Sequence, residues 1–386
     1  MNDFVYSYPT KVYFGVGAAA KHLPGELAKV GKTVLLAYGG GSVKRNGVYD
    51  EICGILQAAG KTVVDFPGVM PNPTYAKVQE GAALCRERGV DFILAVGGGS
   101  VFDCCKVIAA QAMTDKDIWE LEYADHGMPT AFLPMGAVVT ASGTGAEMNN
   151  GAVITNEEKK IKGAVWGASA SFAILDPTYT LSLPMKQVIS GAFDTLSHCM
   201  ETYFGMPGAD NLSDRMNEAI MVSVIENIRV LLKDNLNMAA RSELEWASAM
   251  AENGILKIGK VTDFQGHQIE HQLGAYTDCN HGCGLAVIHP ALYRHMYKEA
   301  PARFARFAQV VWGVDPAGRT EEETALAGID ALAAFIREIG LPTTFTEMGI
   351  TDESVLRATA DTCNLTAGCC KKFDREEIFQ LLKECL

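Results

Sequence analysis

The sequence has no apolar stretch long enough to cross a membrane, and it is short of positive charge. Its 386 residues include 33 Lys and Arg against 46 Asp and Glu, which gives a net charge of −13. No apolar run reaches the ~18 residues that a membrane-spanning helix needs. Binding to nucleic acid or to an anionic membrane requires a basic surface, which this composition does not favour. We therefore expect no nucleic-acid partner and no membrane partner.

A secretion signal and a disulfide pattern are missing as well. The N-terminal segment MNDFVYSYPTKVYFG has an acidic residue at Asp3 and no apolar signal core. The 11 Cys are an odd number in a large chain, and no two of them form a CxxC pair. We therefore expect reduced thiols and a cytoplasmic protein.

The first half of the chain alternates apolar runs with helical patterns. Continuous apolar runs are typical of strands buried on both faces, and here they predict strands at Thr33–Tyr38, Lys61–Phe66, Asp91–Val96, Thr130–Pro134 and Ala137–Val139. Helical patterns cover Asn46–Ala59 and Thr74–Arg88. This order predicts right-handed βαβ units in a parallel sheet, that is, an α/β domain.

The second half has long segments with helical periodicity and few β-branched runs. Examples are Asp214–Leu232, Arg241–Ile258 and Glu321–Ile339. The change falls near Asp176–Pro184, where two prolines frame the segment DPTYTLSLP. Because 386 residues exceed one ordinary core, we expect two domains: an α/β dinucleotide-binding domain at 1–183 and an all-helical domain at 184–386.

Two glycine clusters follow two of the predicted strands. They are Gly39, Gly40, Gly41 and Ser42 after the first strand, and Gly97, Gly98, Gly99 and Ser100 after the third. Glycine lets backbone approach a phosphate closely, and a helix that opens there offers free N–H groups. The alternative is that these turns merely end strands. Neither cluster has the GxGxxG spacing of the common dinucleotide motif, so the pattern alone predicts only a phosphate-binding α/β domain.

A set of histidines and one aspartate has metal-ligand spacing. Asp194 and His198 are four residues apart in a helical pattern, as are His267 and His271, so each pair shares a helix face. His281 follows in a glycine-containing turn, CNHGCG. Carboxylate and imidazole ligands suit Fe(II) or Zn(II). The spacing therefore predicts a metal site, although each histidine taken alone could be a structural or surface residue.

Cysteines offer a rival metal site. Cys199, Cys279 and Cys283 flank these histidines, and thiolates bind zinc well, so a structural Cys/His zinc site is an alternative. The remaining histidines have no comparable neighbours and are expected to be structural or surface residues: His22, His126, His289 and His295.

Several longer segments together resemble the iron-containing alcohol dehydrogenase family, and within it the butanol dehydrogenase-like branch of NADPH-dependent aldehyde reductases. The segments are YFGVGA at 13–18, GGGSVKRNGVYD at 39–50, PNP at 71–73, GGGSVFDCCK at 97–106, TASGTGAE at 140–147, AILDP at 173–177, GAFDTLSHCME at 191–201, and HQIEH and HGCGLAVIHP between 267 and 290. The similarity runs nearly end to end, and the patterns are specific in combination.

The resemblance implies a fold, a ligand set and a cofactor site. It implies the dehydroquinate synthase-like architecture, with the active site in the cleft between the two domains. It implies that Asp194, His198, His267 and His281 hold one divalent metal, with Fe(II) favoured over Zn(II), and that His271 is a catalytic residue beside the nicotinamide. The cofactor-binding positions it implies are Gly39, Gly40, Gly41, Ser42, Asn72, Gly97, Gly98, Gly99, Ser100, Asp103, Thr140, Thr144, Asn149 and Lys162.

The position that follows the first strand bears on the choice of nucleotide. Enzymes that select NAD place a carboxylate near the ribose 2′-OH. The matching position here is Gly39, so we expect a preference for NADP(H), with Lys44 or Arg45 near enough to add positive charge. If the glycines only turn the chain, NAD(H) is accepted too.

The activity expected is hydride transfer between the nicotinamide and a small alcohol or aldehyde. Two alternatives have the same architecture: a glycerol or diol dehydrogenase, and a lyase of the dehydroquinate synthase type. A lyase for a polyanionic substrate needs Lys and Arg at its metal region, and Asp194–Glu201 and Asp263–Pro290 contain none. The alternating segment FVYSYPTKVYFG resembles an edge strand, which predicts at least a homodimer.

Overall fold

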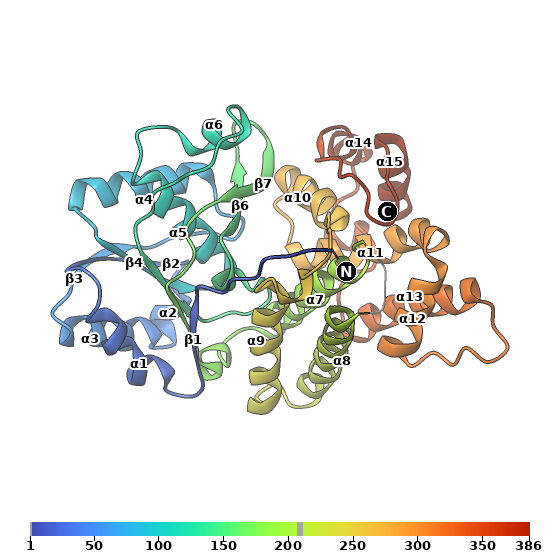
Figure 1. Ribbon diagram of the computed structural model, residues 1–386, viewed down its shortest axis with the longest axis horizontal. Helices are drawn as coiled ribbons and strands as arrows, with labels where there is room; N and C mark the ends of the chain where they lie inside the picture. The colour runs from blue at the N-terminus through green and yellow to red at the C-terminus, as the bar shows by residue number, and fades with distance from the viewer. Residues whose placement is uncertain (1, 207–210) are drawn as a thin grey trace. The chain divides into compact units, whose positions relative to one another are not determined.

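The computed structural model describes residues 2–206 and 211–386. Its internal contacts divide the chain into two units. One unit is Ser7–Pro184, and the other is Met185–Leu386 together with the N-terminal residues up to Tyr6. Figure 1 colours the chain from its N-terminus to its C-terminus.

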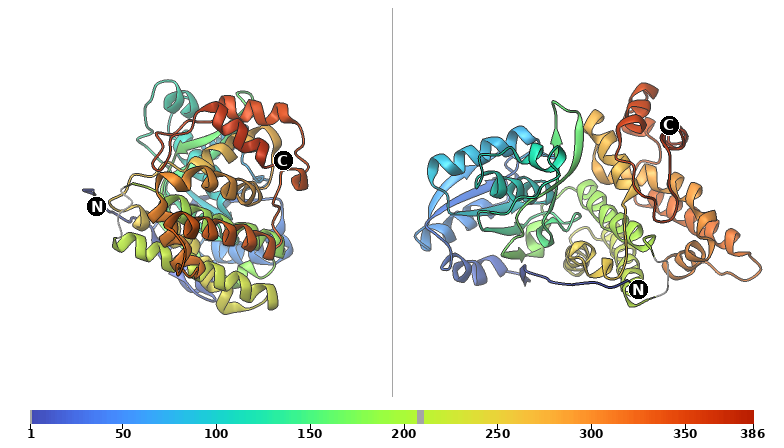
Figure 2. Two further views of the ribbon diagram at one scale, coloured as in Figure 1. Left: turned by 90° about the vertical axis from the view of Figure 1, so that its right-hand side faces the viewer. Right: turned by 45° about the horizontal axis from the view of Figure 1, so that its top comes forward.

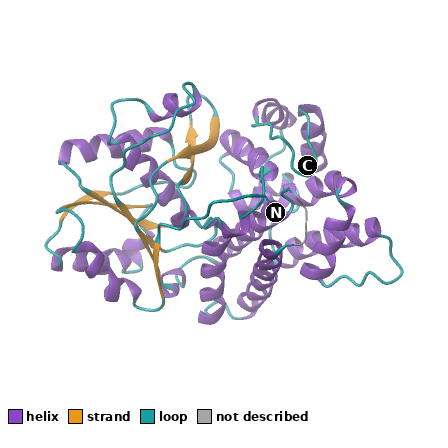
Figure 3. Ribbon diagram, viewed as in Figure 1, coloured by secondary structure: helices purple, strands orange, loops and turns teal. Residues whose placement is uncertain are grey.

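The unit Ser7–Pro184 is built on a parallel sheet of six strands in the order β1-β8-β5-β4-β2-β3. The strands are β1 (Lys11–Phe14), β2 (Thr33–Tyr38), β3 (Thr62–Phe66), β4 (Phe92–Gly97), β5 (Met135–Val139) and β8 (Phe172–Leu175). Apart from β1 and β3 their residues are almost entirely buried, as continuous apolar runs predict. The predicted α/β domain with a parallel sheet is therefore confirmed, and every strand of the described residues belongs to this unit (Figure 3).

Helices cover both faces of this sheet (Figure 1). They are α1 (Ala18–Leu27), α2 (Ser42–Arg45), α3 (Val48–Ala58), α4 (Tyr75–Arg88), α5 (Gly99–Gln111) and α6 (Ile118–Tyr123), with short 3₁₀ turns at Ala146–Met148 and Pro177–Thr180. The helices predicted at 46–59 and 74–88 are α3 and α4. Thr74 fixes the start of α4, since its side chain accepts a hydrogen bond from the Lys77 N–H.

Two features of this unit differ from the sequence prediction. The strand predicted at Thr130–Pro134 is wrong, because this segment is a loop that leads into β5. Pro129 and Pro134 bracket it, and proline cannot donate a ladder hydrogen bond. The antiparallel hairpin of β6 (Gly151–Asn156) and β7 (Ile161–Trp166) was not predicted, because its strands mix small, polar and apolar residues.

The second unit is helical. Its helices are α7 (Met185–Tyr203), α8 (Leu212–Lys233), α9 (Met238–Glu252), α10 (Gln265–Thr277), α11 (His281–Met296), α12 (Pro301–Trp312), α13 (Glu321–Glu338), α14 (Glu353–Thr362) and α15 (Arg375–Glu384), with 3₁₀ turns at Ile255–Lys257, Tyr297–Glu299 and Thr346–Met348. Figure 2 shows these helices from two further sides. The predicted all-helical domain is confirmed, and one apolar cluster runs through the unit.

The predicted bounds of the three long helices in this unit agree with the structure to different degrees. The predictions at 214–232 and 321–339 match α8 and α13, and α13 begins with a capping box formed by Thr320 and Glu323. The prediction at 241–258 is too long. Here α9 ends at Glu252, because Gly254 takes a left-handed conformation with φ 87°. No helix of the described residues is long and apolar enough to cross a membrane.

Candidate active site

Three helices of the second unit carry the predicted metal ligands. Asp194 and His198 lie one turn apart on α7, and His267 lies in the first turn of α10. His281 is the first residue of α11, so the turn expected around it is the start of a helix. The side chain of Asn280 caps that start by accepting a hydrogen bond from the Cys283 N–H at 3.1 Å.

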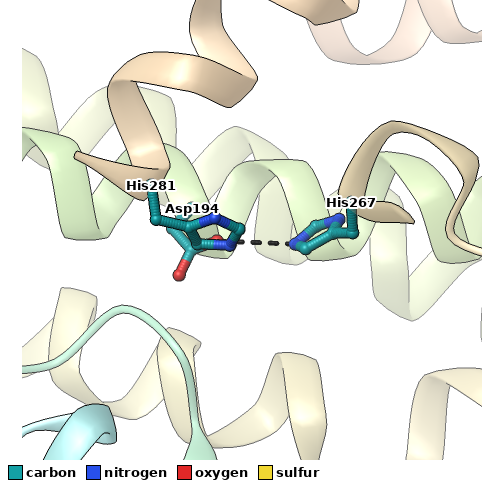
Figure 4. A group of neighbouring side chains, drawn as sticks. All are labelled: Asp194, His267 and His281. Atoms are coloured by element: carbon teal, nitrogen blue, oxygen red, sulfur yellow. Dashed lines mark ion pairs between the residues drawn. The ribbon is translucent and has the colours of Figure 1, made fainter. Parts of the chain in front are cut away.

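The three histidines surround one oxygen of the aspartate. Asp194 Oδ1 lies 3.4 Å from His281 Nε2, 3.6 Å from His267 Nε2 and 3.9 Å from His198 Nε2. Figure 4 shows Asp194, His267 and His281 pointing toward one another. Ligands that each lie ~2.1 Å from one ion are about 3 to 4 Å apart, so these separations suit a single metal. Ligand atoms of Asp194, His267 and His281 all lie within 4.8 Å of one another. His198 is near this group through its approach to Asp194 Oδ1.

Buried atoms of this cluster lack hydrogen-bond partners. Asp194 Oδ1 and His267 Nε2 are both buried, and neither has a hydrogen-bond partner among the described residues. A buried polar atom without a partner is costly, and a bound cation would satisfy both atoms. The donor set of one carboxylate and three imidazoles therefore fits a divalent transition metal.

The charges around Asp194 keep it ionised. Burial raises the pKa of the Asp194 carboxyl, but the imidazoles of His198, His281 and His267 outweigh burial and hold that pKa below its usual value. Burial lowers the pKa of His198. Asp194 therefore supplies a negative charge in a buried cluster that is otherwise made of imidazoles.

Two glutamates, which the sequence analysis missed, lie behind two of the histidines. His267 Nδ1 contacts Glu201 Oε2, and His281 Nδ1 contacts Glu270 Oε2. Glu201 follows His198 by three residues on α7, so the i, i+3 spacing could have indicated a shared face. Glu270 follows His267 by three residues on α10 in the same way, but each glutamate contacts a histidine of a different helix, which spacing alone does not reveal.

His271 lies beside the cluster rather than within the group around Asp194. Its ring stacks on His281, with ring centres 5.2 Å apart, and lies edge-on to His267 at 5.8 Å. His271 also forms a group with Glu270 and His281, in which the atoms able to bind a metal all lie within 4.8 Å of one another. The structure thus brings all five predicted residues of the metal region together.

The cysteine alternative finds no support. All 11 cysteines are free, and none belongs to a metal-type group in the described residues. Burial raises the pKa of the Cys199 thiol well above its usual value, which disfavours the thiolate that zinc requires. Cys279 Sγ instead lies 3.6 Å from Glu270 Oε1. Among the other histidines, His289 is buried and bonds Ser197 Oγ at 2.5 Å, which is a structural role.

In the other unit, the second glycine cluster and the loop after β5 form one contact region. The chain passes from β4 to α5 through Gly97, Gly98 and Gly99, and the Thr140 N–H donates to Gly97 O at 2.8 Å. A Cβ on Gly98 would lie 3.1 Å from Ala141 Cβ, and one on Gly99 would lie 2.3 Å from Thr144 Oγ1. Glycine at positions 98 and 99 permits this approach, so the loop that carries Thr140 and Thr144 lies against Gly97–Gly99.

Asp103 and Asn149 are joined through a buried lysine. Lys106 Nζ lies 3.0 Å from Asn149 Oδ1 and 2.6 Å from Gly151 O, and 3.5 Å from Asp103 Oδ1. Asp103 Oδ2 also accepts from the Val153 N–H at 2.9 Å. These contacts attach the β6–β7 hairpin to α5. Lys162 is buried on β7, opposite Thr155.

The first glycine cluster lies at the end of β2. Gly39 and Gly40 follow Tyr38, Gly41 has φ 100°, and Ser42 begins the four-residue α2. Lys44 Nζ lies over the rings of Tyr49 and Tyr38, at 4.4 and 5.0 Å, and 3.8 Å from an Asp65 carboxylate oxygen. Asn72 takes a positive φ of 52° in the loop before α4.

The two units thus have different chemistry. One has glycine loops at the carboxyl ends of parallel strands, where α/β sheets bind nucleotides. The other has a buried Asp–His cluster suited to a divalent metal. Together they define the class of nucleotide-dependent metalloenzymes.

Comparison with known proteins narrows this class. Residues 9–177 match the family "Iron-containing alcohol dehydrogenase", and residues 188–386 match "Fe-containing alcohol dehydrogenase family, C-terminal". The chain is 42% identical to a probable NADH-dependent butanol dehydrogenase 1 of Bacillus subtilis, over the full length of both. It is 35% identical to the NADPH-dependent aldehyde reductase YqhD of Escherichia coli, over 92% of this chain and 91% of that one. The crystal structure of an NADH-dependent butanol dehydrogenase A from Thermotoga maritima superposes with a TM-score of 0.93, at 34% identity and coverage of 100% and 99%.

The chain belongs to the iron-containing alcohol dehydrogenase family, in its butanol dehydrogenase-like branch. It is an NAD(P)-dependent oxidoreductase that acts as an alcohol dehydrogenase or aldehyde reductase. The family predicted from the sequence segments is thereby confirmed, and the lyase alternative is not supported.

Proposed function

We propose that this enzyme interconverts a small primary aldehyde, of about the size of butanal, and its alcohol. The sheet unit acts as the dinucleotide-binding domain, and the helical unit acts as the metal-binding domain. The helical unit holds one divalent metal, with Fe(II) favoured over Zn(II), through Asp194, His198, His267 and His281. The observation that carries this proposal is the gathering of the three imidazole Nε2 atoms within 3.9 Å of Asp194 Oδ1. The acidic composition and free cysteines support a cytoplasmic enzyme.

The residues divide the task. A divalent metal bound here supplies Lewis-acid polarisation of a carbonyl oxygen, and a reduced nicotinamide supplies hydride. The backbone N–H groups at the start of α5, with Gly97–Ser100, bind the pyrophosphate. Thr140, Thr144, Lys162, Asp103 and Asn149 bind along the dinucleotide. Lys106 contacts both Asp103 and Asn149.

His271 is the proposed proton-relay residue. Its buried ring lies against His281 and next to His267, so it can pass a proton between the substrate oxygen and solvent without itself holding the metal. Replacement by Ala is expected to lower turnover while leaving the metal content unchanged. Loss of metal in His271→Ala would instead make it a ligand.

The nucleotide preference is proposed to be NADP(H), with NAD(H) also accepted. No carboxylate stands at Gly39, and Lys44 lies two residues after Ser42, near the same turn. The relatives divide on this point: the B. subtilis protein is named NADH-dependent and the E. coli protein NADPH-dependent. The proposal therefore rests on the residues of this turn.

Turnover and metal content together test the proposed function. Loss of absorbance of the reduced nicotinamide on addition of butanal is expected. A panel of C2 to C6 aldehydes, diols and hydroxyacids then ranks the substrates, and a diol preference would favour the glycerol or diol alternative. His267→Ala should lose bound metal and nearly all turnover while staying folded, whereas the control His295→Ala, which changes a histidine bonded to Glu384, should keep both.

Elemental analysis of protein purified without added zinc decides between iron and zinc. Full metal occupancy in His267→Ala would contradict the ligand set. No oxidation of reduced nicotinamide with any aldehyde of the panel would contradict the activity.

A further inference from the structure

Glu201 on α7 contacts both the ring of a metal-site histidine and the backbone at the start of the helix that carries this histidine. Its Oε2 contacts His267 Nδ1 and lies 3.0 Å from the His267 backbone N, and its Oε1 lies 2.6 Å from Gly266 N. These N–H groups are at the start of α10, where no intrahelical acceptor exists. One carboxylate from α7 therefore fixes both the ring of His267 and the position of the helix that carries this ring.

Glu270 plays the same part for His281. It lies on α10 and is fully buried, and its Oε2 contacts Nδ1 of His281 at the start of α11. Since an ionised carboxylate only accepts hydrogen bonds, Nδ1 of each ring carries the hydrogen. The lone pair of each ring is then on Nε2, the atom that faces Asp194.

A glycine makes room for each carboxylate. A Cβ on Gly266 would lie 2.9 Å from His289 Cε1 and 3.2 Å from Glu201 Oε1, and one on Gly284 would lie 2.8 Å from Glu270 Cγ. Both glycines are in helices, where glycine is otherwise unfavourable. Gly266, next to His267, and Gly284, three residues after His281, therefore each leave space that a side chain would take from one of these carboxylates.

We propose that Glu201 and Glu270 are positioning residues that set the tautomer and ring orientation of His267 and His281 for metal binding, with Gly266 and Gly284 providing the space they occupy. This inference rests on the metal site proposed above. His198 differs, because its Nδ1 has no hydrogen-bond partner among the described residues. The site thus consists of two imidazoles held from behind and one held only by packing.

Metal affinity tests the proposal directly. The Kd for Zn²⁺ is measured by competition with a chromophoric chelator for the wild type, Glu201→Gln and Glu270→Gln, and the Tm of each metal-free protein is recorded. Loss of such a partner typically weakens metal binding about 10- to 100-fold, and we expect this for each variant. Glu218→Gln is the control, since Glu218 is a buried carboxylate of the same unit that bonds Tyr203 and Arg306 and no metal-site histidine.

The control separates positioning from general destabilisation. Glu218→Gln should lower the Tm of the metal-free protein and leave the Kd within about twofold of wild type, far below the change that loss of a partner carboxylate causes. Zn²⁺ affinity in Glu201→Gln and Glu270→Gln equal to that of wild type, or reduced only as far as in Glu218→Gln, would overturn the inference.

A second variant leaves both carboxylates in place. Gly284→Ala puts a methyl group against Glu270 and should also raise the Kd, while Gly54→Ala, at a helix position with nothing within 4 Å, should not. Unchanged Zn²⁺ affinity in Gly284→Ala would argue against the proposal that Gly284 provides the space that Glu270 occupies. A wild type that binds no Zn²⁺ or Fe²⁺ at all would instead overturn the proposed metal site, which is a different result from equal affinities.

Discussion

At the scale of single residues, an unusual buried carboxyl lies beside the proposed cofactor loop. Glu147 follows the Thr140–Gly145 loop and is buried, and its burial raises its pKa to about 7. Lys106 acts in the opposite direction but does not cancel this effect. Glu147 is therefore protonated in the folded protein at pH values where it is ionised in the unfolded chain.

This shift gives a pH dependence of stability with a definite sign. Below about pH 4.5 Glu147 is protonated in both states, and between about pH 4.5 and 7 only the unfolded state ionises, so stability falls as pH rises. Glu147→Gln should remove up to about 3 kcal/mol of this loss. Thermal unfolding at pH 5 and pH 8 measures it, with exposed Glu157→Gln as control. A stability difference between Glu147→Gln and wild type that is the same at both pH values would contradict this interpretation.

Gly39 offers a test of nucleotide selection. Gly39→Asp places a carboxylate where the 2′-phosphate of NADPH is proposed to bind, and the repulsion should lower kcat/KM for NADPH about tenfold more than for NADH, equivalent to ~1.4 kcal/mol. Gly39→Asn is the matched control, since it has nearly the same shape without charge. Its Cβ meets the same neighbour, Val69 O, at 3.2 Å. A wild type that already prefers NADH in kcat/KM would refute the proposal whatever the variants do.

The residues of the metal region were largely predictable from the sequence, whereas the two glutamates that contact the histidines were not. Helical spacing pairs Asp194 with His198 and His267 with His271, because i, i+4 residues share a face. Joining the pairs to His281 required either the family resemblance or the structure. The contacts of Glu201 with His267 and of Glu270 with His281 were not predictable because each joins two helices, and the capped helix start at His281 resembled a turn in the sequence.

At the scale of elements, the loop after β4 and the loop after β5 depend on each other. They follow neighbouring parallel strands, which meet in register from Ile93 and Met135 to Gly97 and Val139. Because both loops leave the same edge of the sheet, the absence of a side chain at Gly98 and Gly99 decides how closely they approach. The shape of the proposed pyrophosphate site is thus a property of the pair of loops.

Gly99→Ala tests this dependence. The new methyl group would lie 2.3 Å from Thr144 Oγ1, so Thr144 and its loop must move. The Kd for NADPH, measured by fluorescence titration, is expected to rise about tenfold, or ~1.4 kcal/mol. Gly54→Ala should leave this Kd unchanged, because its Cβ enters open space. Equal Kd values for Gly99→Ala and wild type would show that this loop does not shape the nucleotide site.

The elements themselves were predicted unevenly. Strands β2, β3 and β4 were predicted correctly because their apolar runs are continuous. Helices α3 and α4 were predicted correctly because polar residues interrupt their apolar residues. The hairpin β6–β7 alternates burial along β6 and contains glycine and lysine in β7, so its local pattern is weak. Its attachment to α5 through Lys106 is a contact between residues over 40 positions apart, which no local pattern reveals.

At the scale of the whole molecule, the free edge of the sheet points to a dimer, which we propose. β1 is the last strand on one side and pairs only with β8 in the described residues. Lys11 N donates to Ser171 O, so the N–H groups of Val12 and Phe14 point away from β8, as alternation along a strand requires. Phe14 is 44% exposed and Val16 71%. Such an edge is a template for pairing with a second copy.

Light scattering at micromolar concentration should show about twice the 41.5 kDa of one chain. Val12→Pro removes an N–H from the free edge without removing a ladder bond to β8, and should shift the enzyme toward the monomer. Val12→Thr is the control and should remain dimeric. A wild type that shows only the 41.5 kDa species would contradict the dimer.

The division of the chain into units has a further consequence for its connectivity. Residues up to Tyr6 belong with the helical unit, as in the bond from Asn2 N to Gly259 O at 3.0 Å, and the chain returns to that unit at Met185. The sheet unit is thus an insertion within the helical unit, tethered at both ends. A protease cut between Tyr6 and Ser7 therefore leaves both units in one polypeptide, whereas after a cut between Pro184 and Met185 the N-terminal residues hold the two pieces by noncovalent contacts.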